Sequence, residues 1–174
     1  MKKKIILTML LLSLCGCTKK ELDFKETKDY KFVKDNKENI EKIVLKTSTL
    51  LGEKCYLVDT EKAYDLLDNI TIKEETSEHI TDSNIYIMVH FNENIKNKYY
   101  FEKEKLYEEK IVKSFWFEST HLVHSGKKYI LEKEPLFFIN KDEVPENIDE
   151  EVNTVLIAEE EIECEVLKQV VREY

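Results

Sequence analysis

The segment Ile85–Phe91 alternates between two sets of side chains with a period of two, and this pattern constrains the fold more than any other feature. One set is Ile85, Ile87, Val89 and Phe91, and the other is Tyr86, Met88 and His90. Successive side chains of a strand point to opposite faces of a sheet, so the pattern predicts a strand with one face in a core. We expect Tyr99–Phe101 to be its hairpin partner, across a turn at residues 92–97.

Other runs rich in β-branched and aromatic residues predict further strands. They are residues 40–47, 54–59, 112–118, 121–124, 127–132 and 136–139. Gly52 separates the first two runs, and Ser125-Gly126 joins the run 121–124 to the run 127–132. A two-residue Ser-Gly connection is typical of a hairpin, because glycine accepts the positive φ of a tight turn.

Helical spacing of apolar residues occurs in two places. Thr60 is a candidate N-cap for a short helix that ends near Ile70, and residues from about 150 to 173 form an acidic amphipathic pattern. Residues 154–158 also suit a strand, so the start of the second helix is open. The whole order predicts an α+β fold: a mainly antiparallel sheet, a short helix after the first hairpin and a C-terminal amphipathic helix.

The N-terminus has the features of a secretory signal. Lys2–Lys4 form a basic segment, and the apolar run Ile5–Leu14 follows it. A membrane-spanning helix needs about 20 apolar residues, so this run is too short to span. We therefore expect residues 1–16 to be a signal peptide that is removed.

The sequence Leu14-Cys15-Gly16-Cys17 resembles the lipobox of bacterial lipoproteins. Leu14 and Gly16 stand where that motif has a branched apolar and a small residue, whereas Cys15 fits no such frame. The resemblance implies that Cys17 is acylated and becomes the first residue of the mature chain, on the outer face of the cell membrane. The alternative is a plain secretory signal with two incidental cysteines.

Residues 17–37 then read as a lipid-anchored tether, and residues 38–174 as a single domain. Lysines and acidic residues alternate through this stretch without an apolar period. Lys19 and Lys20 would lie beside the lipid headgroups, although an ordinary solvated charge run explains them equally well. Tyr30, Phe32 and Val33 could instead add a short edge strand.

Composition excludes several kinds of function. The formal charge of −9 makes the chain a poor binder of nucleic acid. Only three glycines and two prolines are present, and no glycine-rich phosphate loop, nucleophile elbow or zinc-binding cysteine pair is recognisable. We therefore assign no catalytic, cofactor-binding or metal-binding residue, and we expect neither a cofactor nor nucleic acid as a partner.

Two groups of residues still invite a chemical interpretation. His121 and His124 could bind a metal, but residues three apart on a strand point to opposite faces, so exposed hairpin histidines are favoured. A polar cluster formed by Glu74, Glu75, Glu78 and His79 could perform acid–base chemistry. Nothing in the local sequence would desolvate that cluster, and a solvated loop is favoured.

The aromatic run Phe115-Trp116-Phe117 and the cysteines Cys55 and Cys164 leave alternatives open. Alternation places Trp116 opposite its two neighbours, so Trp116 is a candidate for surface recognition if it is the exposed member. Cys55 and Cys164 could form a disulfide outside the cytosol. Buried free thiols are the favoured interpretation, because the pairing needs a contact that sequence does not reveal.

Residues 38–140 resemble small lipoproteins of unknown function from low-GC Gram-positive bacteria. The resemblance rests on the segments Ile40–Ile43, Leu66–Ile70 and Leu122–Leu131. It implies no catalytic residues. We expect a non-enzymatic, membrane-anchored module that binds a protein or envelope component. The alternative is a small cell-surface hydrolase or an accessory subunit of an envelope enzyme, which a cleft joining His79, His90 and a buried glutamate would favour.

Overall fold

A computed structural model describes residues 21–78, 84–95, 111–149, 151 and 153–164. The helices that lie entirely within this part of the chain are η1 (Phe24–Glu26), α2 (Lys28–Asp35), η2 (Lys37–Asn39), α3 (Thr60–Asp68) and η3 (Lys141–Glu143). The strands are β1 (Ile40–Thr49), β2 (Gly52–Val58), β3 (Ile72–Thr76), β4 (Asn84–Phe91), β5 (Val112–Glu118), β6 (His121–His124), β7 (Lys127–Leu131), β8 (Glu134–Phe138) and β9 (Asn153–Ile162).

The described strands form one sheet in the order β3-β7-β6-β5-β4-β1-β2-β9-β8. Neighbouring strands are antiparallel except β8 and β9, which are parallel. The expectation of a mainly antiparallel sheet is therefore confirmed. The rings of Phe117 on β5 and Phe137 on β8 lie 5.4 Å apart, although four strands stand between β5 and β8 in that order. The sheet must curl to bring them together.

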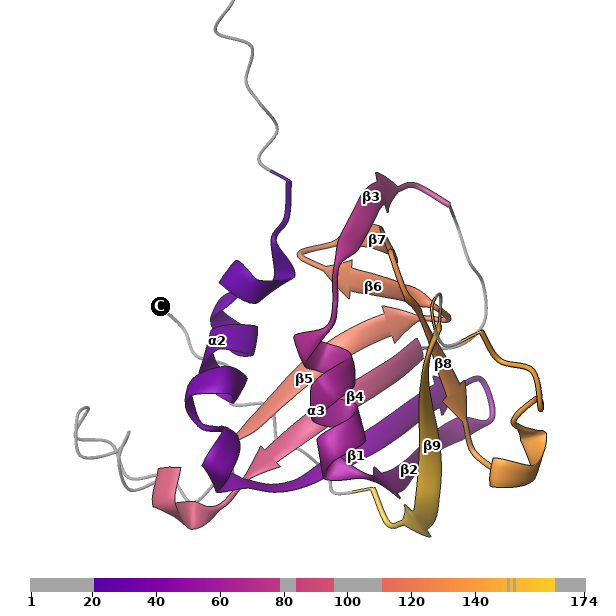
Figure 1. The fold of residues 1–174 in the computed structure, drawn as a ribbon. Coiled ribbons are helices and arrows are strands. Elements are labelled where there is room, and N and C mark those ends of the chain that lie inside the picture. The colour runs from indigo at the N-terminus through magenta and orange to yellow at the C-terminus, as the bar shows by residue number, and fades with distance from the viewer. Residues whose placement is uncertain (1–20, 79–83, 96–110, 150, 152, 165–174) are drawn as a thin grey trace, which may run out of the picture.

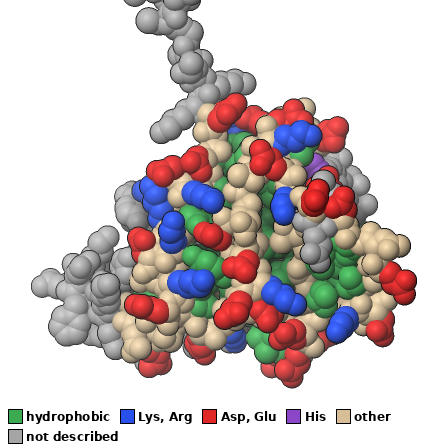
Figure 2. Space-filling view, viewed as in Figure 1, with side chains coloured by type: hydrophobic (Ala, Val, Ile, Leu, Met, Phe, Trp, Pro, Cys, Tyr) green, Lys and Arg blue, Asp and Glu red, His purple; other side chains and the backbone are tan. Residues whose placement is uncertain are grey.

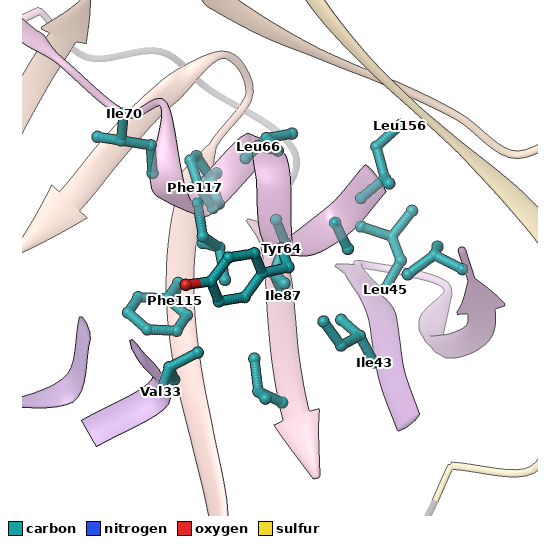
Figure 3. Packing of buried hydrophobic residues seen from close by; sticks show 14 of the residues in the cluster. Val33, Ile43, Leu45, Tyr64, Leu66, Ile70, Ile87, Phe115, Phe117 and Leu156 are labelled. Atoms are coloured by element: carbon teal, nitrogen blue, oxygen red, sulfur yellow. The ribbon is translucent and has the colours of Figure 1, made fainter. Parts of the chain in front are cut away.

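The helices α2 and α3 lie on one face of the curled sheet (Figure 1). Val33 of α2 and Leu67 of α3 are fully buried, and they share one apolar cluster with Ile43, Leu45 and Ile87 of the sheet. Figure 3 shows these sheet side chains directed toward the helices. Burial of apolar area at about 25 cal/mol per Å² makes this cluster the main source of stability. A smaller cluster of Val44, Cys55 and Met88 lies on the other face.

The two predicted hairpins are present. In the turn between β6 and β7, Ser125 has φ 52° and Gly126 has φ 74°. Two successive residues with positive φ define the tight turn whose twist matches that of the flanking strands. The turn between β1 and β2 projects Leu50 and Leu51, which are fully exposed, before Gly52 with φ 127°.

The expected short helix after the first hairpin is confirmed as α3, although its cap differs. The helix begins at Thr60. Asp59 is the N-cap, because its Oδ1 accepts a hydrogen bond from the Lys62 amide at 2.8 Å. Strand β4 is also present, with β1 and β5 as its partners. The proposed partner Tyr99–Phe101 lies outside the described residues.

The expectation of a tether over residues 17–37 is wrong for residues 24–35. These residues form η1 and α2, and Phe24, Tyr30 and Val33 are buried. The Thr27 side chain caps α2 by accepting a hydrogen bond from the Tyr30 amide. The edge strand considered for Tyr30–Val33 is excluded for the same reason. A spacing of three places Tyr30 and Val33 on one face of a helix, against the sheet.

The expectation of a C-terminal helix from about 150 to 173 is wrong for residues 153–162, which form β9. This strand pairs with β2 on one side and with β8 on the other. Leu156 and Ala158 are buried at a spacing of two, which is the period of a strand. Pairing on both sides therefore outweighed the helical spacing of the apolar residues. Residues 165–174 lie outside the described part.

Candidate functional site

A cleft of about 910 Å³ separates β3 from the chain segment that leads into η1. The side of the N-terminal segment is Glu21–Lys25; the opposite side is residues 70–77, with Lys127 and Tyr129 of β7. In Figure 1 the indigo segment at the top of the molecule runs beside β3. A volume of this size falls within the range of about 300–1,000 Å³ that is usual for ligand sites.

Hydrogen bonds and core packing fix both walls of the cleft in position. Asp23 caps η1 by accepting a hydrogen bond from the Lys25 amide at 3.0 Å. Phe24 is buried, with its ring centre 5.2 Å from that of Tyr30 and 5.5 Å from that of Phe115. On the opposite side β3 is hydrogen-bonded to β7 along its length. The N-terminal wall is therefore packed against the core and is not a loose arm.

The rim of the cleft carries both signs of charge. Lys127 Nζ lies 2.7 Å from Glu75 Oε2, and the hydrogen bond to this carboxylate raises the pKa of Lys127. Lys25 and Lys73 are further cations, and Glu21, Asp23 and Glu74 are further acids. Figure 2 shows the same mixture of acidic and basic side chains over this face of the molecule. Opposite charges at the rim suit a ligand that is itself polar but carries no large net charge.

The suggested acid–base cluster lies on a strand rather than in the expected loop. Glu74 and Glu75 are neighbours on β3, and both are exposed and line the cleft. Glu75 pairs with Lys127, and Glu78 follows the end of the strand. His79 lies outside the described residues. The glutamates of the cluster are therefore solvated, as the favoured interpretation expects, although they belong to a strand.

His90 is buried on β4, near a shallow hollow on the other face of the sheet. Lys46 and Glu163 are among the other residues around this hollow. Thr27, Asn36 and His90 are the buried polar residues in the described part of the chain, so the buried glutamate required for a hydrolytic centre is not found there.

His121 and His124 are both partly exposed on β6. The Nδ1 atom of His121 lies 3.4 Å from the Thr120 hydroxyl. Across the described residues, no group of three or more His, Cys, Asp or Glu side chains is arranged to hold a metal ion.

Trp116 is the exposed member of its aromatic run. Its side chain is 37% exposed, whereas Phe115 and Phe117 are buried in the core. The indole stacks on Tyr86 with 6.1 Å between ring centres, and its Nε1 donates a hydrogen bond to Asn84 at 3.2 Å. The predicted alternation is confirmed, and the indole N–H already has a partner.

Cys55 and Cys164 form a disulfide, with their Cα atoms 5.2 Å apart. The favoured interpretation of two free thiols is therefore wrong. The pairing of β2 with β9 brings Ile162 opposite Cys55, which places Cys164 within reach of the same strand. Once β9 is recognised as a strand beside β2, the contact follows. A helix over the same residues would not have implied this contact.

Comparison of the chain with protein-family models, with curated proteins and with solved structures finds no match. None of the helices in the described residues has the length and apolar character needed to cross a bilayer.

Proposed function

We propose that this protein is a lipoprotein anchored through Cys17 to the outer face of the cell membrane, and that its domain is a binding module without enzymatic activity. The lipobox-like sequence Leu14–Cys17 motivates the anchor. The anchor is a diacylglyceryl group joined to the Cys17 sulfur by a thioether bond, and residues 1–16 are removed as a signal peptide. Two or more acyl chains hold a protein stably on a membrane, whereas one alone is marginal.

The disulfide between Cys55 and Cys164 is the observation that carries this proposal. Disulfides persist in oxidising compartments and are rare in the cytosol, so the bond supports a location outside the cell membrane. It also leaves the sulfur of Cys17 for acylation, because Cys55 and Cys164 are the other cysteines of the mature chain and each sulfur forms one such bond.

The cleft beside β3 supports a binding role. Its floor contains apolar side chains and its rim contains opposite charges, which is the composition of a recognition site. The ion pair of Lys127 with Glu75 neutralises one charge of each sign at this rim.

The anchor is tested with Cys17→Ser and the matched control Cys15→Ser, followed by detergent phase partitioning and intact-mass measurement. Thioether formation uses the sulfur of Cys17, so Cys17→Ser should abolish the lipid mass and the cleavage that depends on it. Cys15→Ser should change neither, because residue 15 belongs to the discarded segment. A wild-type protein without lipid mass would reduce the proposal to a secreted protein.

A further inference from the structure

The cleft beside β3 lies close to the proposed lipid anchor. Glu21, its first lining residue, follows Cys17 by four residues. Four residues of fully extended chain reach at most about 14 Å, so the cleft cannot lie far from the bilayer surface. η1 and α2 are packed on the sheet, so residues 24–37 cannot extend the connection between the anchor and the domain. The distance from the lipid to the domain is therefore set by residues 17–21.

One wall of the cleft is the edge of the sheet. β3 is the last strand of the described order, and its other edge pairs with β7. An edge strand presents a row of backbone N–H and C=O groups that can pair with another extended chain. All the residues from Ile70 to Ser77 line the cleft, so the site follows the strand for its whole length.

The cleft combines an apolar floor with a charged rim. Leu22, Phe24, Ile72 and Tyr129 are apolar and at least partly buried, and they form a floor between the strand and the N-terminal segment. Lys73 and Glu74 are exposed on β3 at the rim. A bound strand would place every second side chain toward the floor and the others toward the rim.

We propose that this cleft binds an extended peptide segment, which pairs with β3 as an additional strand, and that its source is the membrane-adjacent segment of a protein in the same bilayer. The peptide chemistry is alternating apolar and polar side chains. The assignment of the peptide to a protein in the same bilayer rests on the lipid anchor of the proposed function. The assignment of the ligand as an extended peptide does not rest on that anchor.

A lipid headgroup fits the cleft less well than a peptide does. Anionic headgroups are attracted by clusters of lysine and arginine. The rim instead combines Lys25, Lys73 and Lys127 with Glu21, Asp23, Glu74 and Glu75, so it offers no net positive charge. A headgroup would also leave the backbone N–H and C=O groups along the edge of β3 without a ligand partner.

The peptide class is tested with the mature chain carrying Cys17→Ser and a displayed library of random peptides. Enriched peptides should have alternating apolar residues and should slow amide hydrogen exchange over residues 72–76. The other edge strand, residues 134–138, is the internal control and should not change. Peptides that protect other residues, or a library without enrichment, would overturn the proposal.

Two variants separate the cleft from other apolar surface. Ile72→Asp places a charge on the floor and should weaken binding of an enriched peptide by about tenfold or more. Leu50→Asp makes the same kind of change at the exposed hairpin tip and should leave binding unaltered. If Ile72→Asp lowers the thermal midpoint, the exchange pattern of the unsubstituted chain decides the outcome.

The membrane-adjacent source is tested with the acylated wild-type protein on phosphatidylglycerol and phosphatidylcholine vesicles. The enriched peptide is fused to a single membrane-spanning helix, either directly or through a long flexible linker. The direct fusion should bind at least as well as the linker fusion. Binding of the linker fusion alone would place the cleft away from the bilayer and overturn this source. Binding of the non-acylated chain to phosphatidylglycerol vesicles, abolished by Lys73→Glu, would favour a headgroup instead.

These measurements also separate the inference from the proposed function. Absence of lipid mass on the wild-type chain removes the anchor and the membrane-adjacent source. The library and exchange measurements use a chain without lipid, so the peptide class stands or falls on them alone.

Discussion

The Tyr30 hydroxyl donates a hydrogen bond to the Asp68 carboxylate and so joins α2 to the last residue of α3. Tyr30 is almost completely buried, and this burial raises its pKa, with a further increase from the hydrogen bond and the negative charge of Asp68. The two bonded residues are 38 positions apart in sequence. The N-terminal helix is thereby part of the domain and holds the lining of the cleft in place.

Tyr30→Phe should lower the free energy of unfolding at pH 7 by about 1 kcal/mol, the usual net value of one hydrogen bond. It should also change the response to alkali. Because the pKa of Tyr30 is raised in the folded state, the native protein retains a proton that the unfolded chain loses above about pH 10. Wild-type stability is therefore complete below that pH and declines above it.

The variant should show a smaller decline between pH 9 and 11, measured as the urea midpoint. Some decline will remain, since burial, and then the nearby Asp68 and Asp65, raise the pKa of Tyr64 as well. An identical decline in both proteins would show that Tyr30 does not contribute to it.

Val33→Ala should destabilise the domain by about 2 kcal/mol, because Val33 is fully buried beneath α2. Lys34→Ala changes the adjacent, exposed residue of the same helix and should stay within about 0.5 kcal/mol of wild type. Denaturant unfolding measures both. If residues 24–35 were only a tether, the two variants would be equally stable.

Replacing both Cys55 and Cys164 by alanine should lower the free energy of unfolding by about 4–5 kcal/mol on the loop-entropy model, because the disulfide closes a loop across 109 positions. The urea midpoint of the double variant should match that of reduced wild type. A reducing agent should leave the double variant unchanged. Equal midpoints for oxidised and reduced wild type would exclude a stabilising bond.

Thermal unfolding with and without EDTA should give the same midpoint. The apolar clusters of the two sheet faces account for the burial of the strands without any metal. A fall of several degrees on chelation would reveal a structural ion, and His121 and His124 would be the first residues to replace.

The elements predicted from sequence are those whose signals are local. The strand β5 is observed over the predicted residues 112–118, because the buried Phe115 and Phe117 alternate with Ser114, Trp116 and Glu118. The β6–β7 hairpin follows from Ser125-Gly126 alone. The helix α3 is present, although it begins one residue earlier than an N-cap at Thr60 predicts.

The missed elements depend on distant partners or on very few residues. The helix α2 has eight residues, so Tyr30 and Val33 supply hardly more than one helical repeat. Strand β9 has apolar spacing that suits a helix, and only its pairing with β2 and β8 makes it a strand. Strand β3 carries Lys73, Glu74 and Glu75 in five residues, which is the composition of a loop.

The candidate site was not predictable for the same reason. The cleft joins Glu21–Lys25 with residues 70–77, and the charged composition of Glu21–Lys25 and of residues 73–77 is typical of solvated chain. Charged residues are common on edge strands, so the sequence of such a strand resembles that of a loop. The packing of Phe24 on Phe115, which forms the second wall, connects residues 91 positions apart and has no local signal.

The place of β9 in the sheet also determines when the domain can be completed. Its partner β2 ends at Val58, whereas β9 begins at Asn153. During synthesis, β2 must therefore wait for almost a hundred further residues before that edge is covered. Contacts between such distant segments pay loop-closure entropy before they contribute stability, and they slow folding. A chain in which residues 153–162 have not yet joined the sheet thus leaves that edge of β2 uncovered, and we expect the pairing of β9 to be a late step of folding.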